Sequence, residues 1–237
     1  IVYLALLVPR MRAHQVGLAP TKAGLLHSAH SGGWLMLRTV SLRVAIMATV
    51  WVVTAAGPET LAAHQLVNTF YNTLAFALDA LAVAAQSLIG KELGAGAVDR
   101  VKALTSTMMR WGTGFGVITG VVLAGLAWVL PPLFTSDPSV RELATWGLLV
   151  LAIQQPVCGL VFVLDGVLIG AEDARYLALT GLLNLVVYAP LLVIVALVPL
   201  PGQPLVWTWV AFGGYLLARA VTLSWRAVRG GWMRVGA

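Results

Sequence analysis

The chain has 237 residues, of which 59% are hydrophobic and only 10% are charged, and its mean hydropathy is +0.90. Soluble globular domains carry about 25% charged residues, so this composition excludes an ordinary soluble domain and indicates a polytopic membrane protein. The formal net charge of +6 comes from Lys and Arg that are dispersed near predicted helix ends, which disfavours nucleic-acid binding. The single cysteine excludes a disulfide framework and a thiol metal site within the chain.

The hydropathy pattern predicts an all-α membrane helix bundle with six transmembrane helices. Residues 1–9 are apolar but too short to cross a bilayer, and we interpret them as the end of a truncated preceding helix. Residues 10–33 are predicted to be a polar connection, and residues 226–237 a basic tail. The six predicted spans cover residues 34–56, 61–89, 108–130, 143–170, 176–198 and 205–225.

The loops differ strongly in charge between the two sides of the predicted bundle. One side receives ten Lys and Arg residues, whereas the other receives Arg141 alone. By the positive-inside rule, loops 10–33, 90–107 and 171–175 and the C-terminus are predicted to be cytoplasmic, with the bundle in the cell (inner) membrane. Tryptophans lie near the predicted span ends, as expected for an aromatic belt; they are Trp34, Trp51, Trp111, Trp128, Trp146, Trp207, Trp209, Trp225 and Trp232.

The second predicted span carries a stripe of polar residues along one helix face. At about 100° per residue, the stripe occupies an arc of roughly 60°. Its members are Gln65, Asn68, Asn72, Asp79 and Gln86. A carboxylate in hydrocarbon costs about 2.5–3.5 kcal/mol even on lenient scales, so this face should border other helices or a water-filled cavity.

The fourth predicted span repeats this pattern. Gln154, Cys158, Asp165 and Glu172 fall within an arc of about 40° at the helical period. At 1.5 Å per residue, Asp79 lies about 18 Å before Lys91, near the middle of the membrane. Asp165 lies only about 10 Å before Glu172 and therefore nearer the cytoplasm, so the two carboxylates are not expected to be equivalent.

Each of these groups has a functional and a structural interpretation. Asp79 is a candidate for exchanging H⁺ or transiently holding Na⁺, or else a hydrogen-bonding group between packed helices. Asp165 is a second coupling-cation candidate, although an ion pair with Arg175 or Arg110 near the helix end explains it equally well. The candidates for lining a substrate cleft, which would otherwise hold helices together, are Gln65, Asn68, Asn72, Gln86, Gln154, Gln155, Asn184 and Tyr188.

The remaining polar and small residues favour structural roles. Arg38, Arg43 and Arg219 are expected to extend toward the lipid headgroups. Gly112, Gly116 and Gly120 recur every fourth residue and predict close helix packing, and Cys158 is expected to be a small packing residue. Pro156 and Pro190 lie inside predicted spans, where they bend helices.

The sequence shows no recognisable catalytic, nucleotide-binding or metal-binding motif. His27, His30 and His64 have no Cys, Asp or Glu partners at metal-ligand spacing. A phosphate-binding GxxxxGK[ST] loop and a Ser, His and Asp catalytic pattern are both lacking. The sequence therefore predicts neither an enzyme nor a cofactor.

Three sequence segments resemble the multidrug and toxic compound extrusion (MATE) family, and in particular its DNA-damage-inducible protein F branch. They are LAAHQ at 61–65, ALDALAVAAQSLIGKELGAG at 77–96 and FVLDGVLIGAEDARY at 162–176. The resemblance implies a twelve-helix transporter with two six-helix lobes, of which this chain matches the second. It also implies efflux of organic, often cationic or amphipathic, solutes by antiport with H⁺ or Na⁺, with an N-terminal lobe and the lipid bilayer as partners.

The resemblance does not supply the ion site. Some family members bind the coupling cation in the second lobe with acids on that lobe's first and fourth helices, whereas the predicted span 34–56 has no acid. Other members use an acid on the first helix of the whole protein. Asp79 and Asp165 therefore remain candidates from the residues alone.

Three alternative functions remain open. The first is efflux of organic anions such as citrate, which Arg38 and Arg43 would attract. The second is a lipid flippase of related two-lobe architecture, and the third is a membrane scaffold that transports nothing.

Overall fold

The computed structural model describes residues 22–233, and these residues form seven helices and no β-strand. Six of the helices are long and apolar enough to cross a membrane, as predicted, and α5 is a short helix between two of them. The helices are α2 (Lys22–Ala55), α3 (Pro58–Gly94), α4 (Val98–Leu126), α5 (Leu130–Phe134), α6 (Pro138–Gly170), α7 (Ala174–Leu197) and α8 (Pro204–Arg229).

Proline and a capping aspartate set several helix starts. The first turns of α3, α6 and α8 contain Pro58, Pro138 and Pro204, respectively. A proline there costs no helical hydrogen bond, because the N–H groups of the first turn have no partner within the helix. At α6, the Asp137 carboxylate also accepts hydrogen bonds from the backbone N–H groups of Ser139 at 2.8 Å and Val140 at 3.4 Å. These three helices therefore begin at prolines that lie one to five residues before the predicted span starts.

Two predicted loops are partly helical instead. Helix α2 begins at Lys22, well before the predicted span at 34, and α4 begins at Val98 rather than 108. Hydropathy detects the part of a helix that lies in lipid, and a polar extension can continue the helix beyond it. Residues 1–9, the first part of the 10–33 connection and the last residues of the tail lie outside the described residues.

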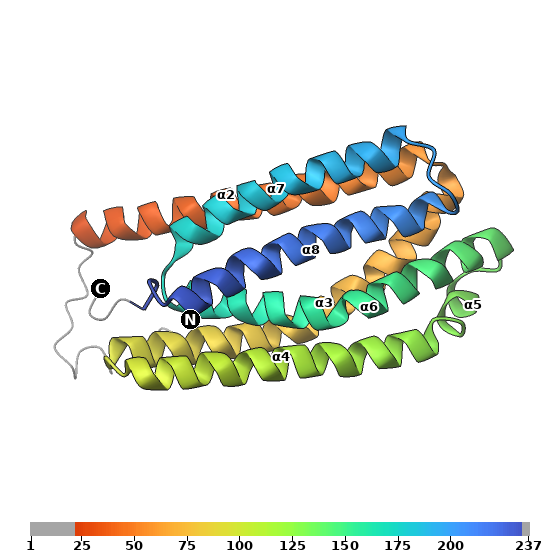
Figure 1. Ribbon diagram of the computed structural model, residues 1–237. Coiled ribbons are helices and arrows are strands. Elements are labelled where there is room, and N and C mark those ends of the chain that lie inside the picture. The colour runs from red at the N-terminus through yellow and green to blue at the C-terminus, as the bar shows by residue number, and fades with distance from the viewer. Residues whose placement is uncertain (1–21, 234–237) are drawn as a thin grey trace, which may run out of the picture.

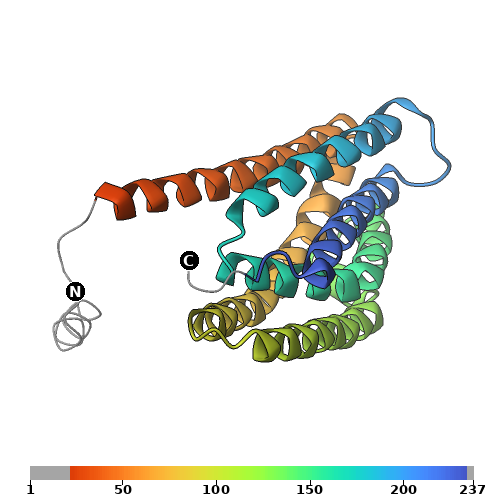
Figure 2. The same cartoon turned by 60° about the vertical axis from the view of Figure 1, so that its left-hand side comes forward.

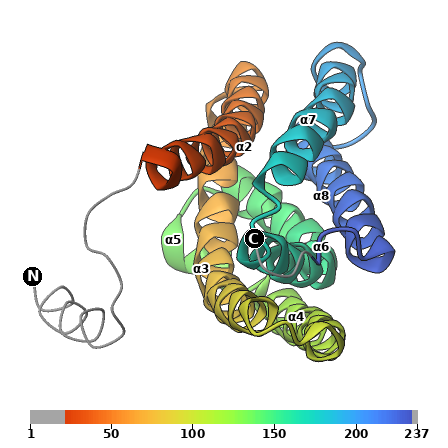
Figure 3. The same ribbon diagram turned by 90° about the vertical axis from the view of Figure 1, so that its left-hand side faces the viewer.

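The helices form a central group flanked by a separate pair (Figure 1). Helix α6 packs against α3, α4 and α8, while α2 packs along α7. Turned views show α2 and α7 on one side of the bundle and α4 on the other, with α8 between α7 and α6 (Figures 2 and 3). Helix α3 starts beside the end of α2 and finishes beside α4 (Figure 1). The fold therefore has an α2 and α7 side and an α3, α4 and α6 side, joined through α8.

The predicted glycine packing on α4 is confirmed. A Cβ atom on Gly112 would lie 2.5 Å from the backbone oxygen of Gly159, and one on Gly116 would lie 2.3 Å from that of Gln155. A Cβ on Gly120 would lie 2.5 Å from the oxygen of Ala152. Real Cβ atoms do not approach so closely, so these glycines let the α4 and α6 backbones touch.

Glycines on α6 provide a second close crossing, this time with α3. A Cβ on Gly166 would lie 2.2 Å from the backbone oxygen of Ala82, and one on Gly170 would lie 2.4 Å from that of Gln86. These two positions belong to the segments 162–176 and 77–96, which are far apart in the sequence. The crossing fixes Asp79 and Asp165 on neighbouring parts of the bundle.

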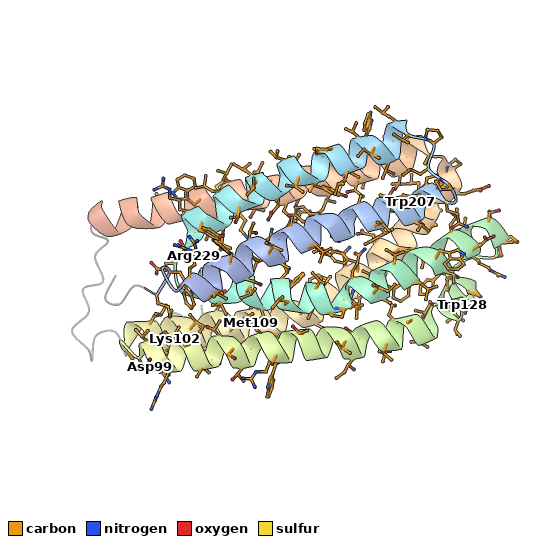
Figure 4. All side chains as sticks on the ribbon, in the orientation of Figure 1. Asp99, Lys102, Met109, Trp128, Trp207 and Arg229 are labelled. Atoms are coloured by element: carbon orange, nitrogen blue, oxygen red, sulfur yellow. The ribbon has the colours of Figure 1, made fainter. Side chains whose placement is uncertain are left out.

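Charged residues at the start of α4 and the end of α8 lie at the opposite end of the bundle from Trp128 and Trp207 (Figure 4). Asp99, Lys102 and Arg229 lie toward one end, whereas Trp128 and Trp207 lie toward the other (Figure 4). The separation matches the loop charges of the sequence. Two tryptophans depart from the predicted belt, because Trp209 and Trp232 are buried in the interior.

We predict that Gly116→Ala destabilises the protein by about 1–3 kcal/mol, the usual cost of an extra methyl group in a packed interior. The new Cβ would meet the α6 backbone at Gln155 and Pro156. Gly114→Ala on the same helix is the matched control, because nothing lies within 4 Å of its Cβ position. Thermal unfolding of the full-length protein in detergent checks the pair, and equal unfolding temperatures would show that α4 does not touch α6 at Gly116.

Candidate functional site

A cavity of about 630 Å³ runs between four helices of the bundle. Along α3 its lining extends from His64 to Gln86, which corresponds to about 33 Å of helix at 1.5 Å per residue. Residues of α2, α6 and α8 complete the walls. The volume lies within the range of roughly 300–1,000 Å³ that is typical of sites for drug-sized molecules.

Most of the polar stripe of α3 borders this cavity. Asn68, Asn72, Asp79 and Gln86 are all lining residues, whereas Gln65 is exposed and is not. Asp79 has no hydrogen bond or ion pair with any residue that the structure describes. The α3 wall thus offers one unpaired carboxylate flanked by amides, a combination that suits a cation or a hydrogen-bonding solute.

Asp165 is in a different situation, because two arginines neutralise it. Its Oδ2 atom lies 2.6 Å from Nη2 of Arg219 and 3.2 Å from Nη2 of Arg38. Arg219 also donates a hydrogen bond from Nη1 to the Tyr215 hydroxyl at 3.2 Å. Asp165 is 8% exposed and Arg219 is 5% exposed, so this ion cluster of Asp165, Arg219 and Arg38 lies inside the bundle. It connects α2, α6 and α8.

The ion cluster corrects two expectations from the sequence. Arg219 does not extend toward the headgroups but is buried against Asp165, and Arg38 reaches the same carboxylate. Nor does Asp165 pair with Arg175, which lies over the Trp34 ring, or with Arg110, which bonds to the Ser106 hydroxyl at 3.1 Å. A buried carboxylate in a membrane needs a charged partner nearby, and spacing along a single chain does not reveal which helix supplies it.

Four of the predicted lining residues lie away from the cavity, between packed helices. The Gln154 Nε2 group donates to the backbone oxygen of Trp209 at 2.7 Å, and the Tyr188 hydroxyl lies 2.6 Å from Oγ1 of Thr49. Asn184 Nδ2 lies 3.5 Å from Oγ1 of Thr222. Gln155 is almost fully buried beside α4. The helical period places these residues on an inward face, but it does not distinguish a cavity from a helix contact.

One part of the cavity is lined by aromatic side chains that the sequence did not assign to a cleft. They are His64 and Tyr71 on α3 and Trp209, Phe212 and Tyr215 on α8. The spacing of Trp209, Phe212, Tyr215 and Arg219 places all four on one side of α8, a periodicity that signals an inward face. Cys158, by contrast, is 1% exposed among apolar residues, which agrees with its predicted packing role.

A membrane helix bundle with a charged, amide-lined interior cavity has the features of a solute transporter. A family model described as MatE matches residues 35–194, more than half of the chain. The chain therefore belongs to the MatE family, whose members are transporters and not enzymes.

Two curated relatives come from Arabidopsis thaliana. Protein DETOXIFICATION 45, chloroplastic, is 30% identical over 166 residues, which cover 67% of this chain and 29% of that protein. Protein DETOXIFICATION 44, chloroplastic, is 32% identical over 136 residues, which cover 56% of this chain and 25% of that protein. The chain therefore spans less than a third of the length of either relative.

Solved structures support the same fold. The Vibrio cholerae MATE transporter VcmN in its bent form superimposes with a TM-score of 0.81 at 20% identity, covering 96% of this chain and 53% of that one. A MOP superfamily transporter from Pyrococcus furiosus gives a TM-score of 0.74 at 21% identity, covering 81% of this chain and 42% of that one. At these identities the similarity establishes the architecture alone.

We predict that Asp165→Asn destabilises the protein by roughly 3–5 kcal/mol, because it leaves Arg219 as a buried cation without its counter-ion. The double variant Asp165→Asn with Arg219→Gln should recover part of this loss, since neither charge then stays unpaired. Unfolding of the full-length protein in detergent measures both effects.

The matched control for this prediction is Asp99→Asn. The ion pair of Asp99 with Lys102 is long, at 3.9 Å, and exposed, so its removal should change stability little. An unfolding curve for Asp165→Asn that coincides with that of Asp99→Asn would show that the ion cluster does not hold the helices.

Proposed function

We propose that this chain is the second six-helix lobe of a secondary active transporter that expels organic, often cationic or amphipathic, solutes in exchange for H⁺ or Na⁺. Membership of the MatE family supports efflux in general. The observation that carries the proposal for this chain is the position of Asp79, an unpaired carboxylate on the wall of a cavity that follows α3 for about 33 Å.

Asp79 suits the coupling role because no ion pair with a described residue compensates its charge. A carboxylate in a membrane interior is costly and is usually retained for function. Binding of H⁺ or Na⁺ would remove that charge, and loss of the ion on the other side of the membrane would restore it. The exposed amides of Asn72 and Gln86, on the same face of α3, would contact the solute or supply oxygen ligands to Na⁺.

Asp165 suits a structural role better than a coupling role. Its Oδ2 atom already contacts Arg219 and Arg38, so two guanidinium groups already compensate the charge that a coupling cation would neutralise. We therefore assign the exchangeable charge to Asp79 and the fixed charge to Asp165. The remaining stripe residue at the cavity, Asn68, belongs with Asn72 among the solute contacts.

The proposal also includes a second six-helix lobe outside this chain and an orientation of the bundle in the membrane. Alternating access in such transporters comes from two bundles that rock around a shared site. The resemblance to the DNA-damage-inducible protein F branch supports the assignment of this chain to the second bundle. The charged end of the bundle, which carries Lys102 and Arg229, would face the cytoplasm. On this orientation, loops 90–107 and 171–175 are cytoplasmic.

We predict that Asp79→Asn abolishes coupled efflux, because Asn keeps the size and polarity of the side chain but cannot gain or lose a charge. The measurement is solute efflux by the full-length protein in proteoliposomes under an imposed H⁺ or Na⁺ gradient. Efflux by the variant should fall to the level seen without a gradient.

Asp99→Asn is the control for this test, since Asp99 is fully exposed on α4 and borders no part of the cavity. A scaffold or structural role for Asp79 predicts another outcome, in which stability changes while gradient-driven efflux persists. Undiminished efflux in Asp79→Asn would remove Asp79 from the mechanism.

A second candidate, efflux of organic anions, is favoured by the charges of the cavity. Arg38, Arg43 and Arg219 line it together with Asp79 and Asp165, so three cationic groups face two anionic ones. Arg43 is exposed and has no ion pair with any described residue. It is therefore available to attract a carboxylate.

For this second candidate we predict that Arg43→Gln weakens transport of a citrate-like anion while leaving transport of an organic cation unchanged or faster. The substitution removes one positive charge from the cavity without breaking a described ion pair. Uptake of labelled citrate and of a labelled organic cation is compared in the same vesicles, with Arg110→Gln outside the cavity as the control. Equal citrate transport by Arg43→Gln and the unsubstituted protein would exclude the anion candidate.

A further inference from the structure

A second groove lies at the end of the bundle that carries Lys102 (Figure 4), between α4 and the chain segment that follows α8. Its volume is about 310 Å³, and it shares no lining residue with the larger cavity between α2, α3, α6 and α8. Lys102, Ser106 and Arg110 lie on its α4 wall. Trp232 and Met233 lie on the opposite wall, so helices from distant parts of the chain form the groove together.

The wall that follows α8 is held in place by the fold. Helix α8 ends at Arg229, and Gly230 follows in the left-handed conformation at φ 68°, which reverses the direction of the chain. Trp232 is 2% exposed and packs in the hydrophobic cluster that contains Val101 of α4. Its Nε1–H group donates to the backbone oxygen of Ala227 at 3.2 Å. The segment after α8 is therefore packed against α4 and gives the groove a fixed shape.

The groove carries two cations, and no acidic residue of the described chain lines it. Arg110 is exposed, donates from Nη2 to the Ser106 hydroxyl at 3.1 Å and has no ion pair with any described residue. The Nζ atom of Lys102 lies 3.9 Å from Oδ1 of Asp99, which is fully exposed and outside the groove. Such a long and exposed ion pair contributes little. The two positive charges are therefore available to an anion.

The two cations and a hydroxyl can reach the same anion. Side chains on a helix lean toward its N-terminus, and the guanidinium of Arg110 accordingly lies beside Ser106, one turn closer to Lys102. Only about 6 Å of helix separates Ser106 from Lys102. The Ser106 oxygen accepts from Arg110, so its own O–H group is left to donate. Guanidinium, hydroxyl and ammonium donors together suit a phosphate, which Arg binds through two parallel hydrogen bonds.

The surroundings of the groove indicate that this phosphate belongs to a lipid. Trp111, next to Arg110, is 66% exposed, and tryptophans on membrane helices lie at the level of the headgroups. Val228, on the rim of the groove, is 83% exposed, and Met109 and Trp232 add apolar surface inside it. A soluble phosphate would use only the charged part of this lining. Basic pockets between membrane helices are a typical site for anionic headgroups.

We propose that the groove binds the headgroup of an anionic phospholipid. Arg110 and Lys102 contact the phosphate, and the Ser106 hydroxyl donates to one of its oxygens. The apolar side chains of Met109 and Trp232 contact the glycerol and the upper part of an acyl chain. The lipid is a bound ligand that joins α4 to the end of α8 and is not the transported solute, so the inference goes beyond the proposed function.

The test is calorimetric titration of dioctanoyl phosphatidylglycerol, a short-chain anionic lipid, into the full-length protein in a neutral detergent. We expect saturable binding. Arg110→Gln should weaken it about tenfold or more, because a charge-assisted hydrogen bond to phosphate is lost. Lys102→Gln should weaken it roughly fivefold, the usual effect of one cation near an anionic headgroup.

Arg100→Gln is the matched control, because Arg100 is an exposed cation on the same helix that does not line the groove. It removes the same charge and should bind the lipid like the unsubstituted protein. Thermal unfolding of each variant confirms that binding is compared on folded protein. Lys102, Arg110 and Arg100 are all exposed, so their substitution should leave the fold intact.

Two further ligands separate the headgroup from its alternatives. Dioctanoyl phosphatidylcholine, whose headgroup has no net charge, should bind at least about tenfold more weakly than the phosphatidylglycerol. Glycerol 3-phosphate, which keeps a phosphate but has no acyl chain, should not displace the lipid at equal concentration. Displacement at equal concentration would overturn the proposal in favour of a site for soluble phosphates.

The proposal is also overturned if phosphatidylglycerol does not bind saturably, if phosphatidylcholine binds as tightly, or if Arg110→Gln and Lys102→Gln both bind normally. Equal weakening by Arg100→Gln would reduce the effect to overall surface charge and overturn it as well. These outcomes are separate from the fate of the proposed function, since binding is measured without a gradient or a transported solute. The groove does not border the larger cavity, so loss of the lipid should not change the ratio of citrate transport to cation transport.

Discussion

The bundle depends on a buried ion cluster in which one carboxylate is held by two arginines from different helices. Asp165 on α6 contacts Arg219 on α8 and Arg38 on α2. In a membrane interior, a lone charge of either sign is costly, so each member of the cluster requires the others. The cluster therefore sets the register of three helices. It also joins α2, which packs mainly along α7, to the central group of helices.

Fixing Asp165 in this way determines which charges of the cavity remain available. Gly166 and Gly170 bring the α6 backbone against α3 at Ala82 and Gln86, so the polar stripe of α3 borders the same cavity as the ion cluster. With Asp165 compensated, Asp79 and Arg43 are the cavity charges that have no ion pair with a described residue. A mobile cation or a charged solute would act on these two groups.

The sequence alone predicted the helices and the polar face of α3, because both follow from periodicity. Four of the six predicted span starts lie within five residues of the observed helix starts, and Asp79, Asn72 and Asn68 border the cavity. The helix extensions that begin at Lys22 and Val98 were missed, because a hydropathy pattern detects only the apolar part of a helix that lies in the membrane. The partners of Asp165 and the burial of Trp209 could not be predicted either. Both depend on which helices pack against each other, and the periodicity of a single sequence does not show which helices are neighbours.

The central claim is that position 79 faces an aqueous cavity and not lipid or a sealed helix contact. The most direct measurement is modification of a cysteine at this position by a charged, membrane-impermeant thiol reagent, in a full-length Asp79→Cys variant that carries no other cysteine; here Cys158 would be replaced by Ala. Ile118→Cys is the matched control, since Ile118 is 63% exposed on α4, which contributes nothing to the cavity. We predict rapid modification at position 79 and little at position 118, whereas a cysteine at 79 that reacts no faster than one at 118 would contradict the account.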